Sequence, residues 1–137
     1  MKHRYLFVSI LLAVSLFSAC TREIPVQQTV VRHGLLYEKG KAEPFTGVIT
    51  GEAREGYRST ICTYRKAYRN GIMNGDCCFW HPNGHLESIE PYRDGKINGV
   101  LTRYDENGRV LVRAHLVDGQ RGGEHGEIFW HRAPTGG

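Results

Sequence analysis

The stretches "YRNGIMNGDCCFWHPNG" (residues 68–84) and "YRDGKINGVLTRYDENG" (residues 92–108) are two copies of one pattern, offset by 24 residues. They share tyrosine, asparagine and glycine at matching places, while most side chains between those places differ. The residues matched in the second copy are Tyr92, Gly95, Asn98, Gly99, Asn107 and Gly108. Self-similarity at a fixed period is the signature of a repeat architecture.

Weaker copies extend the pattern in both directions. Leu116, Gly119 and Gly123 continue the same spacing, and "YEKG" (37–40) opens an earlier copy that carries insertions. The "FWH" at 129–131 also repeats the "FWH" at 79–81. The repeat domain therefore covers residues 33–131.

Each copy predicts one β-hairpin. "PNG" and "ENG" are tight-turn sequences, because asparagine and glycine adopt positive φ at low cost. The segments between the turns have strand length and are rich in Val, Leu, Thr, Ile and aromatic residues. We therefore predict an all-β fold, an elongated antiparallel β-meander of repeated hairpins that forms a single-layer twisted sheet.

Alternation along the strands predicts which side chains face the core. The even-numbered positions are mostly apolar, so we expect them on the packed face: Cys78, Trp80, Leu86, Tyr92, Thr102, Tyr104, Val110, Val112, Ala114 and Leu116. The opposite face should carry a mixed, wettable set: His85, Glu87, Ile89, Arg103, Arg109, Leu111 and Arg113.

The first residues have the features of a secretory leader. A basic start precedes the apolar run 5–17, which is too short for a permanent membrane span. The ending "LFSAC" resembles a bacterial lipobox, which implies lipid attachment at Cys20; an ordinary signal peptide is the alternative. We expect a signal peptide at 1–19, a lipidated N-terminus and linker at 20–32, and a flexible tail at 132–137.

Charge and location follow from this leader. The chain has 18 Lys+Arg and 14 Asp+Glu, and removing Lys2 and Arg4 leaves 16 against 14, a net charge of +2. The charges are mixed in sign, which argues against a nucleic-acid partner. By resemblance to Gram-negative lipoproteins, Thr21 in place of an inner-membrane retention aspartate implies the periplasmic face of the outer membrane.

Three cysteines remain in the repeat domain. In an oxidising periplasm one disulfide would join Cys62 to either Cys77 or Cys78, and the sequence leaves both pairings open. The two neighbouring cysteines point to opposite faces of a strand, so a bond between them would distort it.

Several clusters suggest chemistry. Cys77, Cys78, His81 and His85 include zinc-ligand residue types and a cysteine–histidine pair, yet all four lie on one hairpin. The pairs Glu87 with Glu90 and Asp105 with Glu106 read as solvated strand and turn carboxylates. We therefore predict a protein that is not an enzyme and has no metal or cofactor.

The pattern Tyr-x-x-Gly-x-x-x-Gly-x(4)-aromatic-x-x-Asn-Gly resembles the MORN-type repeat in its bacterial variant, found in YwqK-like antitoxins and small envelope lipoproteins. The resemblance covers residues 68–84 and 92–108 and, more loosely, "VDGQRGGEHGEIFW" and "GLLYEKGKAEPFTGVITG". It implies binding of a protein partner or, in some members, contact with lipid. No catalytic residue belongs to the motif.

We therefore predict a lipoprotein that binds another protein through a sheet face, as an antitoxin or immunity-type protein that neutralises a toxin or effector. The alternative is an envelope scaffold, touching lipid or a surface assembly, without a toxin partner. Expected contact residues combine aromatic and arginine side chains: Phe79, Arg103, Arg113, Phe129 and Trp130. The open sheet edges also favour an edge-to-edge dimer.

Overall fold

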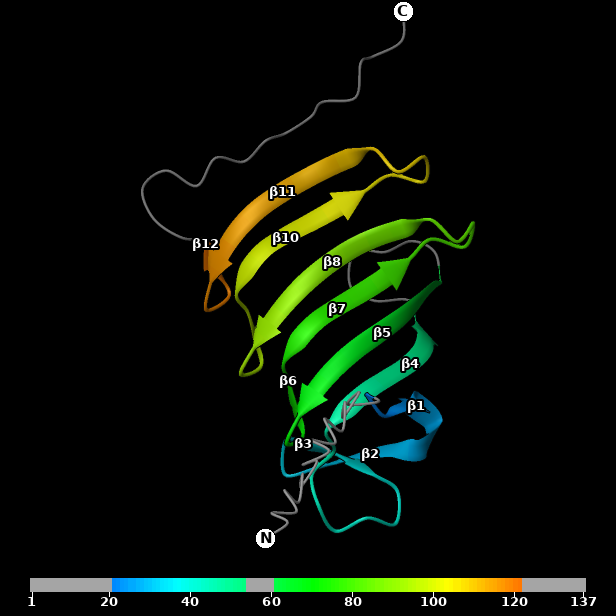
Figure 1. The fold of residues 1–137 in the computed structure, drawn as a ribbon, viewed down its shortest axis with the longest axis vertical. Coiled ribbons are helices and arrows are strands. Elements are labelled where there is room, and N and C mark those ends of the chain that lie inside the picture. Colours follow the sequence, from blue (N-terminus) through cyan, green and yellow to red (C-terminus); the bar gives the residue numbers. More distant parts are fainter. Residues whose placement is uncertain (1–20, 54–60, 122–137) are drawn as a thin grey trace, which may run out of the picture.

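The computed structural model describes residues 21–53 and 61–121, and these residues form an all-β fold (Figure 1). One short 3-10 turn, η1 (Val26–Gln28), accompanies twelve strands. The strands are β1 (Glu23–Pro25), β2 (Thr29–Arg32), β3 (Leu35–Glu38), β4 (Gly47–Ala53), β5 (Cys62–Arg69), β6 (Ile72–Met73), β7 (Gly75–Trp80), β8 (Leu86–Arg93), β9 (Lys96–Ile97), β10 (Gly99–Tyr104), β11 (Val110–Val117) and β12 (Gln120–Arg121).

The described strands form one large sheet and one small one. The large sheet has the order β1-β4-β5-β7-β8-β10-β11-β12, with β6 beside β5 and β9 beside β8. Strand β1 pairs with β4 in parallel, and all other neighbours in this sheet are antiparallel. Strands β2 and β3 form a separate hairpin at one end (Figure 1). The antiparallel hairpins are confirmed, whereas the sheet is mixed and the β2–β3 hairpin adds a second element to the predicted single layer.

The turns that follow β5, β8 and β11 repeat every 24 residues. Asn70, Asp94 and Asp118 have φ of 49°, 50° and 51°. Each precedes a glycine, and these glycines (Gly71, Gly95 and Gly119) have φ of 78°, 82° and 78°. Two successive residues with positive φ make the tight hairpin turn whose twist matches the flanking strands. This requirement explains why the Asn/Asp-Gly pairs recur while the strand side chains vary.

Hydrogen bonds between turns link each repeat to the preceding one. The amides of Gly95 and Gly119 donate to the carbonyl oxygens of Met73 (2.9 Å) and Ile97 (2.8 Å). Side chains repeat the link, because Asn74 Nδ2 donates to Asp94 Oδ1 at 3.4 Å and Asn98 Nδ2 to Asp118 Oδ1 at 3.2 Å. Neighbouring hairpins are therefore joined outside the strand ladders as well as within them.

A hydrophobic cluster lies where β1, β4, β5 and β7 meet the segment from β3 to β4. Its buried members are Ile24, Leu36, Phe45, Ile49, Tyr64, Cys77 and Phe79. The rings of Tyr64 and Phe79 are 6.2 Å apart between centroids, a distance typical of tilted aromatic pairs. Because Ile24 is 7% exposed and β1 pairs with β4, the predicted linker at 20–32 instead contributes a strand to the sheet.

The strand register divides the side chains differently from our prediction. Phe79 is opposite Ser88, and Ser88 is opposite Arg103, on what we call the packed face, the side that carries the hydrophobic cluster. Cys78 is opposite Ile89, and Ile89 opposite Thr102, on the open face. Trp80, Leu86, Tyr104 and Val110 share the open face, whereas Tyr92, Val112, Ala114 and Leu116 lie on the packed face as expected.

The prediction failed because β7 and β8 pair odd-numbered with even-numbered residues, as in Cys77 opposite Glu90. Irregularities between Phe79 and Trp80, and between Arg103 and Tyr104, shift the register again. A shift of one residue moves a side chain to the other face. In the described part of the chain, no helix is long and apolar enough to cross a membrane.

Candidate functional site: the open face of the sheet

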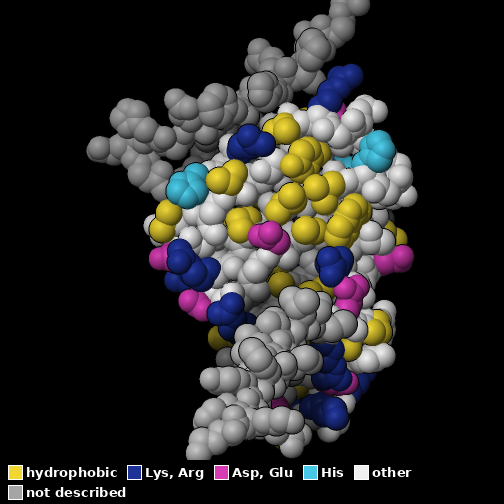
Figure 2. Space-filling model, viewed as in Figure 1, with side chains coloured by type: hydrophobic (Ala, Val, Ile, Leu, Met, Phe, Trp, Pro, Cys, Tyr) yellow, Lys and Arg dark blue, Asp and Glu magenta, His cyan; other side chains and the backbone are white. Residues whose placement is uncertain are grey.

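Half-buried apolar side chains follow one another across the open face. They are Cys78, Trp80, Leu86, Ile89, Tyr104 and Val110, which we call the apolar strip. Register places Trp80 opposite Leu86 and Tyr104 opposite Val110. Figure 2 shows hydrophobic side chains gathered over β7, β8, β10 and β11 on the face toward the viewer. The strip crosses four strands, so residues distant in sequence form one continuous surface.

Cross-strand contacts stabilise this surface, and part of it is exposed to solvent. Directly opposed aromatic and branched side chains stabilise a sheet pair by roughly 0.2–1 kcal/mol each. Val100 adjoins the strip on the same face, opposite His115, and is 48% exposed. A contiguous apolar surface with polar borders is typical of an interaction site.

Charged groups border the apolar strip. Arg65, opposite Cys78, forms an ion pair with Glu23 at 2.7 Å between Nη2 and Oε2. Arg113, opposite Thr102, is exposed and makes no hydrogen bond or ion pair within the described part of the chain. An exposed guanidinium at the border of an apolar surface suits recognition of a carboxylate on a partner.

The five predicted contact residues are not brought together. Phe79 is 2% exposed and belongs to the hydrophobic cluster, so the prediction that it contacts a partner is wrong. Arg103 is half-buried on the packed face, and Arg113 lies on the open face. Phe129 and Trp130, like Cys20, lie outside the described residues. Sequence reasoning placed Trp80 and Tyr104 on the packed face, and it did not name Ile89 as a contact residue although it expected Ile89 on the wettable face.

Glu87 and Glu90 are also buried, at 8% and 7% exposed, although we expected solvated carboxylates. The thiol of Cys62 donates to Glu87 Oε2 at 2.7 Å, and the fully buried Ser88 hydroxyl donates to Glu90 Oε1 at 3.4 Å. Buried polar groups need such partners, since an unmade bond costs about 1–3 kcal/mol. These groups therefore belong to the interior of the fold.

The two histidines of the β7–β8 hairpin hold its tip against the next hairpin. His81 Nε2 lies 3.0 Å from the carbonyl oxygen of Tyr104, and His85 Nδ1 lies 2.6 Å from that of Glu106. A carbonyl oxygen only accepts, so both rings donate through these nitrogens. Within residues 21–53 and 61–121, no group of three or more His, Cys, Asp or Glu side chains is placed so that it could hold a metal ion.

All three described cysteines are free thiols, so neither disulfide that the sequence left open is present. Burial raises the pKa of Cys77 to about 11, and nearby Glu90 adds to the rise. Burial, followed by the charge of Asp76, also raises the pKa of the half-buried Cys78. A raised pKa lowers the thiolate fraction at neutral pH, and the thiolate is the reactive form.

Alkylation of the folded protein should therefore be selective. With iodoacetamide at about pH 8, we expect Cys77 to react about a hundredfold more slowly than an ordinary thiol, and more slowly than the more accessible Cys78. Peptide mass spectrometry of timed samples measures both rates, and the same reaction in urea is the control because it should equalise them. Equal labelling of Cys77 and Cys78 in the folded protein would contradict this placement of the two thiols.

The open face offers contact chemistry: aromatic and aliphatic side chains that are half-exposed beside an accessible guanidinium. Such residues dominate the binding energy of protein interfaces. Comparisons of the chain with protein-family models, curated proteins and solved structures found no match, so no relative supplies a partner or a reaction for this surface.

Proposed function

We propose that this chain is a non-enzymatic envelope lipoprotein that binds a partner protein through the open face of its sheet. The observation that carries the proposal is the apolar strip, which crosses four strands and remains half-exposed. The leader sequence supports a lipid anchor at Cys20 and a location on the periplasmic face of the outer membrane. The partner would then be a periplasmic or imported protein.

The physical basis of binding would be burial of the strip. A standard interface removes about 800 Å² per partner from water, and each Å² of apolar area contributes about 25 cal/mol before the costs of association. Trp80 and Tyr104 would provide the largest contacts, and Arg113 a charge-assisted hydrogen bond to an acidic group. The partner should therefore present apolar side chains with a carboxylate beside them.

Within this class we propose an antitoxin or immunity-type role, in which the face covers the active site of a toxin or effector. The MORN-type resemblance of the repeats supports this choice, and occlusion requires area and shape rather than reactive groups. In the scaffold alternative, the same face would join a surface assembly. A strain lacking the protein would be sensitive to a toxin in the first case and would remain insensitive in the second.

A matched pair of variants tests the surface. Affinity purification of the tagged full chain from envelope extract should recover a partner that Ile89→Arg loses by at least about tenfold, because the charge would lie within the apolar contact. Val31→Arg is the control, since Val31 is 65% exposed on β2, outside the large sheet. Quantitative mass spectrometry measures recovery, and urea unfolding checks that both variants fold. A partner retained equally by Ile89→Arg would refute binding through the open face.

A further inference from the structure

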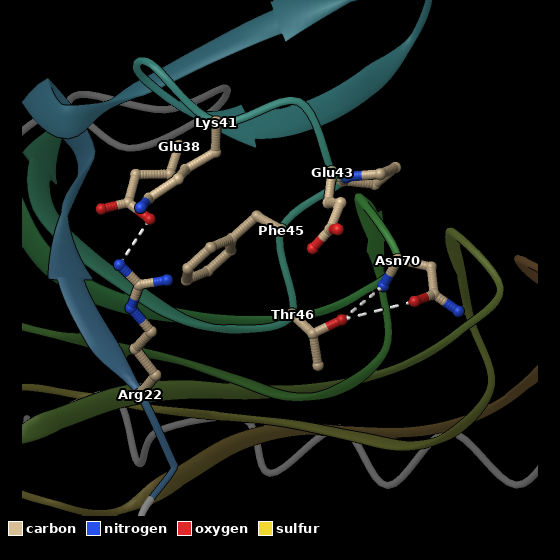
Figure 3. A pocket seen from close by; sticks show the side chains of 8 residues that line it. Arg22, Glu38, Lys41, Glu43, Phe45, Thr46 and Asn70 are labelled. Carbon is tan, nitrogen blue, oxygen red and sulfur yellow. Dashed lines mark hydrogen bonds and ion pairs between the residues drawn. The ribbon is translucent and has the colours of Figure 1, made fainter.

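A hollow of about 600 Å³ lies beside the connection between β3 and β4 and shares no residue with the apolar strip. Figure 3 shows its side chains, which come from three parts of the chain. Its walls are formed by Arg22, Glu38, Lys41, Glu43, Pro44, Phe45, Thr46 and Asn70. Its volume is within the range of small-molecule sites, about 300–1,000 Å³.

The charges in the hollow are balanced but not fully paired. Arg22 Nη2 forms an ion pair with Glu38 Oε2, so each of these two charges has an opposite charge beside it. The Lys41 ammonium and the Glu43 carboxylate make no hydrogen bond or ion pair within residues 21–53 and 61–121. In Figure 3 the Lys41 side chain lies on the Arg22–Glu38 side of the Phe45 ring and Glu43 on the other side. One positive and one negative group are therefore available, separated by an apolar surface.

Backbone contacts hold the segment that carries these two side chains. The Lys39 amide donates to the carbonyl of Gln28 (2.7 Å), and the Phe45 amide to that of Leu36 (2.8 Å). Arg32 Nη2 donates to the Lys41 carbonyl oxygen at 2.7 Å.

The far end of the segment is held as well. The Asn70 amide donates to Thr46 Oγ1 at 2.9 Å, which joins the segment to the β5–β6 turn. A site fixed before the ligand arrives avoids the entropy of ordering it.

We propose that this hollow binds a small zwitterion, in which one anionic group and one primary ammonium are joined by a short aliphatic linker. The anion would contact Lys41 beside Arg22, the ammonium would contact Glu43, and the linker would pack over Phe45. Glycerophosphoethanolamine has this chemistry, both as a free solute and as the headgroup of ethanolamine phospholipids. The inference does not depend on the proposed binding of a partner protein.

Titration of the isotope-labelled full chain in a non-ionic detergent tests the site. Glycerophosphoethanolamine should shift the amide NMR signals of Thr46 and Gly47 saturably, with a Kd in the millimolar range. Glycerophosphocholine, which lacks ammonium hydrogens, and glycerol 3-phosphate, which lacks an ammonium, should each bind about fivefold more weakly, the scale of an exposed ion pair.

Two charge-removing variants separate the two ends of the ligand. Glu43→Gln should weaken glycerophosphoethanolamine about fivefold and leave glycerol 3-phosphate unchanged, whereas Lys41→Gln should weaken both. The controls are Lys39→Gln and Glu52→Gln, since both residues are exposed and neither lines the hollow. Equal affinity in Glu43→Gln and the unmodified chain, or shifts that never saturate, would overturn the proposal.

Vesicle flotation distinguishes the two sources of the ligand. If the ligand is a headgroup, the full chain should associate more with ethanolamine-lipid than with choline-lipid vesicles, and Glu43→Gln should abolish the difference. If the ligand is a free solute, both vesicles should retain the chain equally while the NMR titration still saturates. Either result supports the zwitterion site, provided that the titration depends on Glu43 and Lys41.

Discussion

Replacing Phe79 with alanine is expected to lower the free energy of unfolding by about 3–5 kcal/mol. The ring is 2% exposed and packs with Tyr64 in the hydrophobic cluster, so its removal leaves a cavity between β5 and β7. Urea unfolding followed by tryptophan fluorescence measures the loss.

Leu111→Ala is the control for this substitution, because Leu111 is 39% exposed. It should change the free energy of unfolding by less than about 1 kcal/mol. If Phe79→Ala instead left stability unchanged and abolished capture of a partner, the ring would be an exposed contact residue, as the sequence suggested, and would not belong to the hydrophobic cluster.

Gly71→Ala should destabilise the protein by about 3 kcal/mol, whereas Gly108→Ala should cost only about 1 kcal/mol. Both glycines have positive φ, 78° and 81°, so the backbone strain of adding a methyl group is similar. They differ in space: a Cβ on Gly71 would lie 2.9 Å from both Leu35 Cβ and the Leu36 carbonyl oxygen, while nothing lies within 4 Å at Gly108.

The difference between the two glycine variants, measured by urea unfolding, isolates the close approach of the β3 segment to the β5–β6 turn. Gly71 also accepts a hydrogen bond from the Leu36 amide and donates one to the Phe45 carbonyl, at 2.9 and 2.8 Å. Movement of the turn to relieve the contact would strain both bonds. Equal costs for the two variants would show that Leu35 and Leu36 do not pack against this turn.

The hairpins could be predicted because their signals are local. The dipeptides Asn83-Gly84 and Asn107-Gly108 mark turns by themselves, and in both turns the glycine has the positive φ, 86° and 81°, which it adopts at low cost. The 24-residue period then predicted equivalent strands in successive repeats. The structure has them, because β10 and β11 lie 24 residues after β7 and β8. Local turn chemistry and a repeated spacing were thus sufficient for the fold class.

The faces could not be predicted because they depend on register, which is a property of strand pairs. Comparing positions 24 residues apart preserves parity, so it relates β7 correctly to β10. It does not relate β7 to β8, where Cys77 is opposite Glu90 and an irregularity follows Phe79. As a result the prediction assigned Phe79 to the exposed face and Trp80 to the packed face, which is the reverse of the structure. The predicted contact surface was therefore on the wrong side of the sheet.

Nonlocal contacts also explain the remaining errors. The segment at 20–32 lacks the repeat, yet Glu23 is opposite Val48 in a parallel pair that no local pattern signals. Glu87 and Glu90 are charged residues of the kind found on solvent-exposed strands. In the structure, however, Glu87 accepts a hydrogen bond from the thiol of Cys62 on β5, 25 positions earlier in the chain. The hollow escaped prediction for the same reason, since Arg22 and Asn70 meet only in three dimensions.

The backbone hydrogen bonds from Gly95 to Met73 and from Gly119 to Ile97 span the same number of positions along the chain. The two asparagine–aspartate hydrogen bonds beside them also share one spacing. Such equivalence makes one period an interchangeable module: a gene could gain or lose it by tandem duplication or deletion, and the new junctions would reproduce the old ones. Length, and with it the reach of the surface, would then evolve in whole steps without a redesign of the interior.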